Sequence, residues 1–265
     1  MNSDFIGRLK GSLKEFFGFG GYQRTPEGYM SPQHLIFVSS LMVLMIALAV
    51  VLGLKMRKKD LGRKNRVLIA AAIIMDLLEI FKIVLLCFRE NDPTHWRLNL
   101  PLFLCSIQLI ALPVAAFTRG RLKEAALDFV LIFGVLGAVM GTYFAGQNYA
   151  AYPVFGFDNV VSGLTHVIAG FAAIYIGVSG MASLKKKNIP ITFGILLFFC
   201  GAAFAANAII DYNYMFLRRG DGTPYDIFYN LVGGNPVLYP MIVIGLFLLY
   251  ITVFYLVSTP IKRKR

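Results

Sequence analysis

The chain has few of the residues that build metal centres and disulfide frameworks. Its 265 residues include only three cysteines and three histidines. No two cysteines form a CxxC pair, so neither a zinc nor a haem site has support. A phosphate-binding glycine loop, an internal repeat and a low-complexity tract are absent as well. We therefore predict no metal site.

Polar stretches long enough for a soluble domain are also lacking. The chain is 57% hydrophobic with a mean hydropathy of +0.67, well above ordinary soluble domains. Apolar runs of roughly 18 or more residues are typical of membrane-spanning helices. We predict an all-α membrane protein, a polytopic bundle of seven transmembrane helices joined by mostly short links, at residues 35–54, 67–88, 98–117, 125–144, 161–181, 189–209 and 237–257.

The net charge of +12 is compatible with nucleic-acid binding, but its distribution indicates a membrane topology instead. Lys and Arg gather in alternate links, with seventeen on one side of the predicted membrane and eight on the other. Basic residues favour the cytoplasmic side. We therefore place the N-terminus outside and the C-terminus inside, and expect no nucleic-acid partner.

The segments that flank the predicted spans differ in character. Residues 1–34 lack the continuous apolar stretch of a cleaved signal peptide, so we expect span 35–54 to act as its own signal anchor. Within residues 1–34, apolar residues recur at three- and four-residue spacing between basic ones, which predicts an amphipathic interfacial helix. Residues 35–257 form the predicted transmembrane domain, and 258–265 a basic cytoplasmic tail.

Charged residues lie inside the second predicted span. Asp76, Glu79 and Lys82 follow one another at i, i+3 steps, so they share one broad helix face, and Glu79 can pair with Lys82. Ionisable groups inside a membrane are costly unless paired or hydrated, so each suggests a functional role. This face either forms a structural polar network or lines a site, and Lys82 is its strongest site candidate.

The third predicted span contains a cysteine beside polar residues and two prolines. Cys105 lies seven residues into the span, roughly 10 Å deep at 1.5 Å per residue. Asn99 precedes Cys105, and Gln108 follows it by one turn. Most intramembrane cysteines are small packing residues, so Cys105 alone indicates little. A disulfide between Cys87 and Cys105 is a minor alternative.

The fifth predicted span contains the only histidine within an apolar span. His166 lies five residues into this span, roughly 8 Å deep by the same rise. Both spans run in one direction, so the thiol of Cys105 and the imidazole of His166 occupy similar depths. A buried histidine is often only a hydrogen-bond partner between helices. A cysteine–histidine pair, however, can generate a thiolate that attacks an ester carbonyl.

The link at 211–236 is long for a connection within a bundle, which predicts a structured or lid-like segment. Asn207 precedes it, and Asn213 and Tyr214 lie near its start. Arg218 or Arg219 is suited to hold a lipid phosphate through paired donors. An interfacial loop with an aromatic belt is the alternative.

Several strings together resemble a known family. Leu-Pro-Leu-Phe-Leu-Cys-Ser at 100–106, His166, and Asn-Tyr-Met-Phe-Leu at 213–217 are similar to the bacterial YwaF-like integral membrane family. That family is related to the transmembrane protein 164 family, and the resemblance covers roughly residues 65–255. Members often carry histidine two residues before the cysteine, whereas this chain has Phe103 there, which implies a slower reaction or another substrate.

The resemblance implies a cysteine-dependent phospholipid acyltransferase in which Cys105 and His166 are catalytic. Its expected partners are membrane phospholipid and lysophospholipid substrates, and its expected location is the bacterial cytoplasmic (inner) membrane. No cofactor is expected, because the acyl group arrives as an activated ester. The side chains expected to bind substrate or stabilise the oxyanion are Lys82, Asn99, Gln108, Asn207, Asn213, Tyr214 and Arg218.

Two functions of other classes remain open. In a transporter or lipid-binding protein, Asp76, Glu79, Lys82 and His166 line a pathway and Cys105 merely packs. The sequence lacks two matching halves with broken spans, which disfavours transport. A seven-span receptor rests on helix count alone, and such fold-level analogy is weak support for a function.

Overall fold

The computed structural model describes residues 2–182 and 184–263, with side chains described from residue 6 to residue 258 except residue 183. The described residues form helices and no strands. The α-helices are α1 (Asn2–Phe17), α2 (Pro32–Met56), α3 (Leu61–Arg89), α4 (Gln108–Phe117), α5 (Gly120–Met140), α6 (Gly146–Ala151), α7 (Phe157–Ser179), α8 (Ile189–Ile210), α9 (Asp226–Leu231) and α10 (Leu238–Arg263), with 3-10 helices η1 (His95–Asn99), η2 (Lys186–Asn188) and η3 (Tyr214–Phe216).

The all-helical class is confirmed, and every predicted span overlaps a helix. Among the described residues, four helices are long and apolar enough to cross a membrane, namely those that contain α2, α7, α8 and α10. Charged residues interrupt α3 and α5, and α4 is apolar but short. The count of seven spans and the orientation of the termini stay predictions.

The prediction of one continuous helix over 98–117 is wrong. The chain forms η1, then an irregular segment at 100–107, and only then α4. Leu100 is extended (φ −63°, ψ 146°), as expected for a residue before proline. The Ser106 hydroxyl accepts from the Phe103 N–H at 2.9 Å and donates to the Phe103 carbonyl at 3.1 Å, closing a tight turn. Cys105 therefore sits on a turn before α4 and not within a helix.

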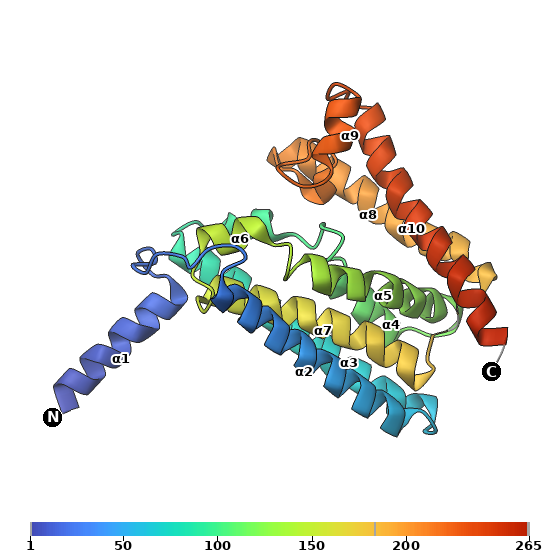
Figure 1. Cartoon of the computed structure of the whole chain (residues 1–265), viewed down its shortest axis with the longest axis horizontal. Coiled ribbons are helices and arrows are strands. Elements are labelled where there is room, and N and C mark those ends of the chain that lie inside the picture. Colours follow the sequence, from blue (N-terminus) through green and yellow to red (C-terminus); the bar gives the residue numbers. More distant parts are fainter. Residues whose placement is uncertain (1, 183, 264–265) are drawn as a thin grey trace.

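Helices α2, α3, α4, α5 and α7 lie side by side as a central bundle with α7 in the middle (Figure 1). Small residues bring α5 and α7 close together. A Cβ atom at Gly134 would lie 2.7 Å from the Ala169 carbonyl oxygen, and one at Gly170 would lie 2.7 Å from the Ala138 Cβ. Close backbone approach through small residues is typical of packed membrane helices.

An ion pair joins α3 to α7 at one end of the central bundle. Arg89 donates from its two terminal nitrogens to the Asp158 carboxylate at 2.6 and 3.0 Å, and Tyr22 donates to the same group at 2.6 Å. Burial and the neighbouring Asp158 carboxylate raise the pKa of Tyr22. A paired Arg–carboxylate contact is geometrically specific, so it fixes the relative position of the two helices.

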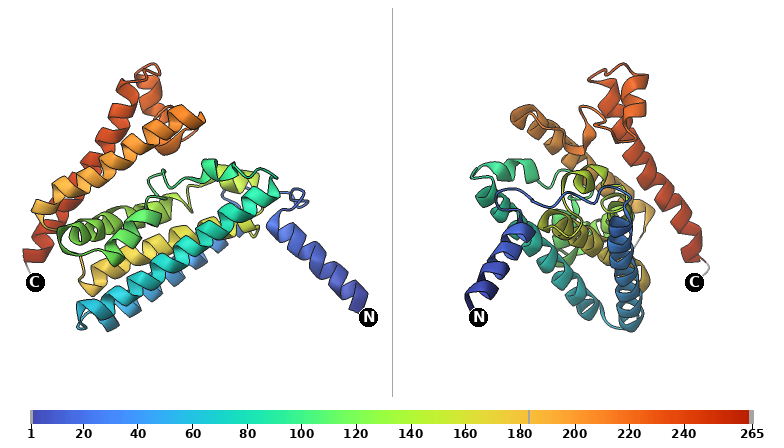
Figure 2. Two further views of the ribbon diagram at one scale, coloured as in Figure 1. Left: turned by 180° about the vertical axis from the view of Figure 1, so that it is seen from behind. Right: turned by 60° about the vertical axis from the view of Figure 1, so that its left-hand side comes forward.

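Helices α8 and α10 form a hairpin, closed by α9, that leans away from the central bundle (Figures 1 and 2). It joins the bundle where α8 begins and α10 ends. There the fully buried Asp128 of α5 accepts from Leu184 N at 2.9 Å, Asn188 Nδ2 at 3.1 Å and the Tyr255 hydroxyl at 2.9 Å. A buried carboxylate is tolerated when its oxygens are hydrogen bonded.

The flanking segments have simple structures. Within 1–34, α1 projects away from the rest of the molecule (Figure 2), and its outward Ile6, Leu9 and Leu13 are about half exposed. Part of the segment predicted as a basic tail continues α10 as far as Arg263. Residues 264–265 lie outside the described residues.

Candidate active site

A small polar pocket of about 70 Å³ lies inside the central bundle. Helix α3, the turn before α4, and α7 supply its walls. It brings together Cys105 and His166, two residues 61 positions apart in the sequence. The remaining polar side chains around it are those of Glu79, Lys82, Ser106, Ser162 and Thr165.

His166 is held in one tautomer by its own helix. Its Nδ1 lies 2.7 Å from the Ser162 carbonyl oxygen one turn earlier. A carbonyl oxygen only accepts, so Nδ1 carries the proton and donates. In the neutral ring, Nε2 then has a free lone pair, assigned here from the hydrogen-bond partner. The imidazole is thus prepared to accept a proton at Nε2.

The thiol of Cys105 and the imidazole of His166 both line this pocket. Both residues are only partly buried. Within the described part of the chain, the backbone N–H groups of Cys105 and Ser106 have no backbone acceptor. Helix α4 starts just beyond this turn, so the positive end of its dipole lies next to the turn that carries Cys105.

Gly137 of α5 and Gly141, which caps the C-terminal end of α5, make room for this pair, and the sequence analysis did not single them out. A Cβ at Gly141 would lie 1.9 Å from His166 Cδ2, and one at Gly137 would lie 3.3 Å from Cys105 Cβ. Only a missing side chain permits such close approach. Their Gly-x-x-x-Gly spacing was visible in the sequence, and it signals close helix packing in membranes.

Lys82 and Glu79 form an ion pair in the pocket wall. Lys82 Nζ lies 2.5 Å from Glu79 Oε1, and the side chains are 17% and 11% exposed. The predicted pairing along α3 is therefore present in the structure. Asp76, one turn away, does not line the pocket, and its Oδ1 has no hydrogen-bond partner among the described residues.

Asn207 and Tyr214 lie outside the pocket and hold the chain that precedes Cys105. The Asn207 amide donates to the Tyr214 carbonyl at 3.0 Å and accepts from the Tyr214 N–H at 2.6 Å. The Tyr214 hydroxyl donates to the Arg97 carbonyl and accepts from Leu100 N at 3.2 Å. These bonds connect the loop after α8 to the segment at 97–100.

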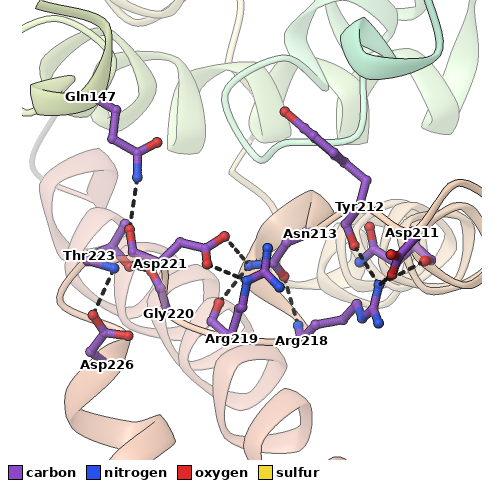
Figure 3. Close-up of polar contacts among 12 residues, drawn as sticks. Gln147, Asp211, Tyr212, Asn213, Arg218, Arg219, Gly220, Asp221, Thr223 and Asp226 are labelled. Atoms are coloured by element: carbon purple, nitrogen blue, oxygen red, sulfur yellow. Dashed lines mark hydrogen bonds and ion pairs between the residues drawn. The ribbon is translucent and has the colours of Figure 1, made fainter. Parts of the chain in front are cut away.

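Asn213 and Arg218 belong to a polar network on the loop between α8 and α9 (Figure 3). The Asn213 amide donates to the Arg219 carbonyl and to Asp221 Oδ2, both at 2.8 Å. Arg218 pairs with Asp211 at 2.5 Å, and this contact lowers the pKa of the Asp211 carboxyl. Gln147 of α6 donates to the Asp221 carbonyl at 2.9 Å, which ties this loop to the central bundle.

The two other predicted polar residues are placed differently again. Gln108 is 1% exposed, and neither atom of its amide has a partner among the described residues. Asn99 donates to the His95 carbonyl at 3.5 Å within η1. Neither residue lines the pocket. Of the residues predicted to bind substrate, the structure brings only Lys82 to Cys105 and His166.

Phe103 occupies an aromatic cluster and lies outside the polar pocket. Its ring centroid is 5.2 Å from that of Tyr214, 5.6 Å from Phe216 and 6.2 Å from Tyr212. Such packing is stabilising beyond its buried area.

The cysteines Cys87, Cys105 and Cys200 are free thiols. The described residues hold no cluster of three His, Cys, Asp or Glu side chains suited to a metal ion.

Comparison with known proteins places this arrangement in a family. The TMEM164 family model matches residues 29–258. The chain belongs to the TMEM164 family. The match covers α2 to most of α10 and therefore all the residues of the polar pocket. No curated protein and no solved structure matches the chain. TMEM164-family membership is consistent with a membrane protein whose function concerns lipids.

Proposed function

We propose that this TMEM164-family protein is a membrane-embedded lipid acyltransferase or esterase that uses Cys105 as nucleophile and His166 as base. The observation that carries the proposal is the meeting of the two side chains in one polar pocket. A nucleophile within hydrogen-bond reach of a base that is itself oriented by a third group is typical of covalent catalysis. The Ser162 carbonyl is that third group.

The first step transfers an acyl chain to the protein. His166 Nε2 takes the thiol proton, and the sulfur attacks the carbonyl carbon of a phospholipid ester. The C–S bond forms while the C–O bond to glycerol breaks, and His166 returns the proton to the departing oxygen. The products are a thioester on Cys105 and a lysophospholipid.

The second step reverses the roles of the same groups. The hydroxyl of a lysophospholipid, or a water molecule, attacks the thioester carbonyl and gives its proton to His166. The C–S bond breaks, and the proton passes to the sulfur. The product is a new phospholipid or a free fatty acid. The acyl group stays activated throughout, so no cofactor is required.

The backbone N–H groups of Cys105 and Ser106 are the favoured oxyanion donors. They belong to the turn that carries the nucleophile, and neither has a backbone acceptor in the described part of the chain. A donor of this kind commonly contributes about 3 kcal/mol to the transition state. Asn99, Gln108 and Asn207, expected from the sequence as alternatives, lie outside the pocket.

Lys82 is the group we assign to the lipid phosphate. Its ammonium lies in the pocket wall, and Glu79 is its one ion-pair partner among the described residues. A lipid phosphate close to this ion pair would give Lys82 a second anionic partner near the reacting atoms. A pocket of about 70 Å³ is too small for a whole headgroup, so the phosphate would contact Lys82 from the pocket mouth.

The proposal includes the membrane arrangement expected from the sequence. Seven spans with the N-terminus outside and the C-terminus inside would place the pocket in the outer leaflet. The expected location is the bacterial cytoplasmic (inner) membrane, which rests on the resemblance to the YwaF-like family. The charge difference between alternate links supports the orientation.

Product analysis tests the proposal. Purified protein would be incubated with phosphatidylcholine and an isotope-labelled lysophospholipid in mixed micelles, with products followed by lipid mass spectrometry. Cys105→Ala is expected to lower acyl transfer about a thousandfold or more. Cys87→Ala, the matched control at a partly buried thiol outside the pocket, should retain the wild-type rate.

Two outcomes would overturn the proposal. Wild-type rates in Cys105→Ala would exclude this thiol as the nucleophile. Intact lipid carried between vesicles by the wild-type protein, with no lysophospholipid or new acyl species, would favour the transporter or lipid-binding alternative.

A further inference from the structure

The turn that carries Cys105 is not part of a helix, so its position depends on contacts with other segments. Within the turn, the N–H of Phe103 donates to the Ser106 hydroxyl at 2.9 Å, and the Ile107 N–H donates to the Phe103 carbonyl at 3.0 Å. These bonds close the turn around Cys105. They do not fix it relative to His166, which lies on α7.

The first contact from outside the turn is made by the hydroxyl of Tyr214, in the loop between α8 and α9. The hydroxyl donates to the Arg97 carbonyl and accepts from the Leu100 N–H at 3.2 Å. Tyr214 is fully buried, and a buried polar group that loses its partner is costly. The two bonds therefore fix the chain at Leu100, five residues before Cys105.

The second contact is made by aromatic rings. The Phe103 ring lies with its centroid 5.2 Å from that of Tyr214 and 5.6 Å from that of Phe216. Tilted ring pairs at these distances attract one another. Because the backbone of Phe103 closes the turn around Cys105, the loop that holds this ring also holds the turn.

The loop that presents Tyr214 has an unusual backbone conformation. Met215 and Phe216 both have φ of +56°, which is uncommon for bulky side chains. Asn207, near the end of α8, fixes the loop at this point, because its amide accepts from the Tyr214 N–H at 2.6 Å and donates to the Tyr214 carbonyl at 3.0 Å. Such strain persists where the surrounding structure enforces it, and it is concentrated at functional sites.

We propose that Tyr214 is a positioning residue for the nucleophile, whose hydroxyl and ring together hold the Cys105 turn where the thiol can meet His166. The inference rests on the acyl-transfer function proposed above, and it replaces the substrate-binding role expected for Tyr214 from the sequence. Tyr214 does not line the polar pocket, so it acts through Leu100 and Phe103. Displacement of a reacting group by about 1 Å commonly lowers the rate about a hundredfold.

Three variants separate the two contacts from general effects on folding. Tyr214→Phe removes the hydroxyl and keeps the ring, whereas Phe103→Leu removes the ring contact and keeps both hydroxyl bonds. Tyr239→Phe is the matched control, because Tyr239 of α10 is also fully buried and its hydroxyl has no hydrogen-bond partner among the described residues. Thermal unfolding in detergent establishes that each variant is folded.

Thiol chemistry is measured first, without lipid. The full-length proteins are treated with iodoacetamide at neutral and at strongly alkaline pH, and alkylation of Cys105 is followed by peptide mass spectrometry. The thiolate is the reactive form, and at alkaline pH it forms without a neighbouring base. In Tyr214→Phe and Phe103→Leu, the neutral rate relative to the alkaline rate should fall about tenfold, the effect of about one pH unit in ionisation. Tyr239→Phe should keep the wild-type ratio, and Cys87 in the same samples is the internal reference.

Three results would overturn the positioning role. The first is a wild-type ratio in folded Tyr214→Phe, or in Phe103→Leu if Tyr214→Phe does not fold. The second is faster alkylation at both pH values, because Tyr214 would then only cover the thiol. The third is an equal fall of the ratio in Tyr239→Phe, which would make the effect one of general packing.

Acyl transfer then separates this inference from the proposed function. Tyr214→Phe should lower kcat about tenfold to a hundredfold and leave KM unchanged, because Tyr214 lies outside the polar pocket. If the wild type transfers acyl chains and Tyr214→Phe keeps both kcat and the alkylation ratio, the function stands and the positioning role fails. If the alkylation ratio falls in Tyr214→Phe but the wild type forms no acyl product, the positioning role stands and the proposed function fails.

Discussion

The middle of the central bundle and the α8–α10 hairpin differ in how much of their surface is buried. In α7, 56% of the apolar stretch is buried, against 28% in α8 and 22% in α10, and α2 of the same bundle is also 22% buried. Glycines allow near contact between α5 and α7. The hairpin exposes large apolar side chains such as Phe198, Phe204 and Ile209, which are 71%, 53% and 84% exposed.

This difference assigns separate roles to the two regions. Reacting groups must be held in a narrow range of positions, and the polar pocket lies inside the central bundle. The hairpin leans away from the bundle (Figure 1), and none of its described residues lines the polar pocket. Changes in the bundle should therefore affect the chemistry, whereas changes in the helices of the hairpin should mainly affect stability.

The largest effect is expected from His166→Gln, which removes the base and keeps the approximate volume. Acyl transfer should fall by about a hundredfold to ten thousandfold, the usual contribution of a general base. The rate of lysophospholipid formation measures it. His95→Gln, at a partly buried histidine in η1 outside the pocket, should leave that rate unchanged. If His166→Gln kept the wild-type rate, the reaction would not depend on the polar pocket of the central bundle.

A smaller loss is expected from Gly141→Ala, which changes no polar group. The new methyl would lie 1.9 Å from His166 Cδ2 and 2.1 Å from Nε2, so the ring must leave its present position. Misplacement of about 1 Å commonly costs about a hundredfold in rate. Alkylation of Cys105 by iodoacetamide at neutral pH should slow in parallel, which a merely structural role would not require. Gly245→Ala is the control, and equal rates in both variants would contradict close packing at the pocket.

The smallest effect on chemistry is expected from Asp128→Asn, where the hairpin joins the bundle. The variant loses charge-assisted hydrogen bonds from Tyr255 and Asn188, so the free energy of unfolding should fall by about 1–3 kcal/mol. Thermal unfolding in detergent measures this loss. Glu124→Gln, at a more exposed ion pair of the same helix, should cost at most about 1 kcal/mol. A folded Asp128→Asn protein without acyl transfer would show that the two regions are not separate.

Helices α2, α7, α8 and α10 could be predicted from the sequence because each contains a long apolar run. The matched depths of Cys105 and His166 in the sequence agree with their common place in one pocket. The irregular segment at 100–107 could not be predicted. Apolar composition alone gives no sign that Ser106 bonds back to Phe103. Of the two prolines in this predicted span, Pro101 lies in the irregular segment, whereas Pro113 lies inside α4.

The positions of site residues on regular helices could be predicted, but those of residues in the loop between α8 and α9 could not. Lys82 lines the pocket because its position on α3 follows from helical spacing. Asn207, Asn213 and Tyr214 hold loop backbone through bonds that depend on unusual local geometry, such as φ +55° at Asp211. Gly137 and Gly141 were missed because a glycine makes its contribution by leaving space.

The central claim, that Cys105 carries the acyl chain, is tested most directly by intact-protein mass spectrometry. Wild-type protein, Cys105→Ala and Cys87→Ala would be incubated with dipalmitoyl phosphatidylcholine, quenched in acid and weighed. The account predicts a palmitoyl mass increment on the wild type and Cys87→Ala, removed by hydroxylamine, and none on Cys105→Ala. An increment that persists in Cys105→Ala, or lysophospholipid formed at the wild-type rate by that variant, would contradict it.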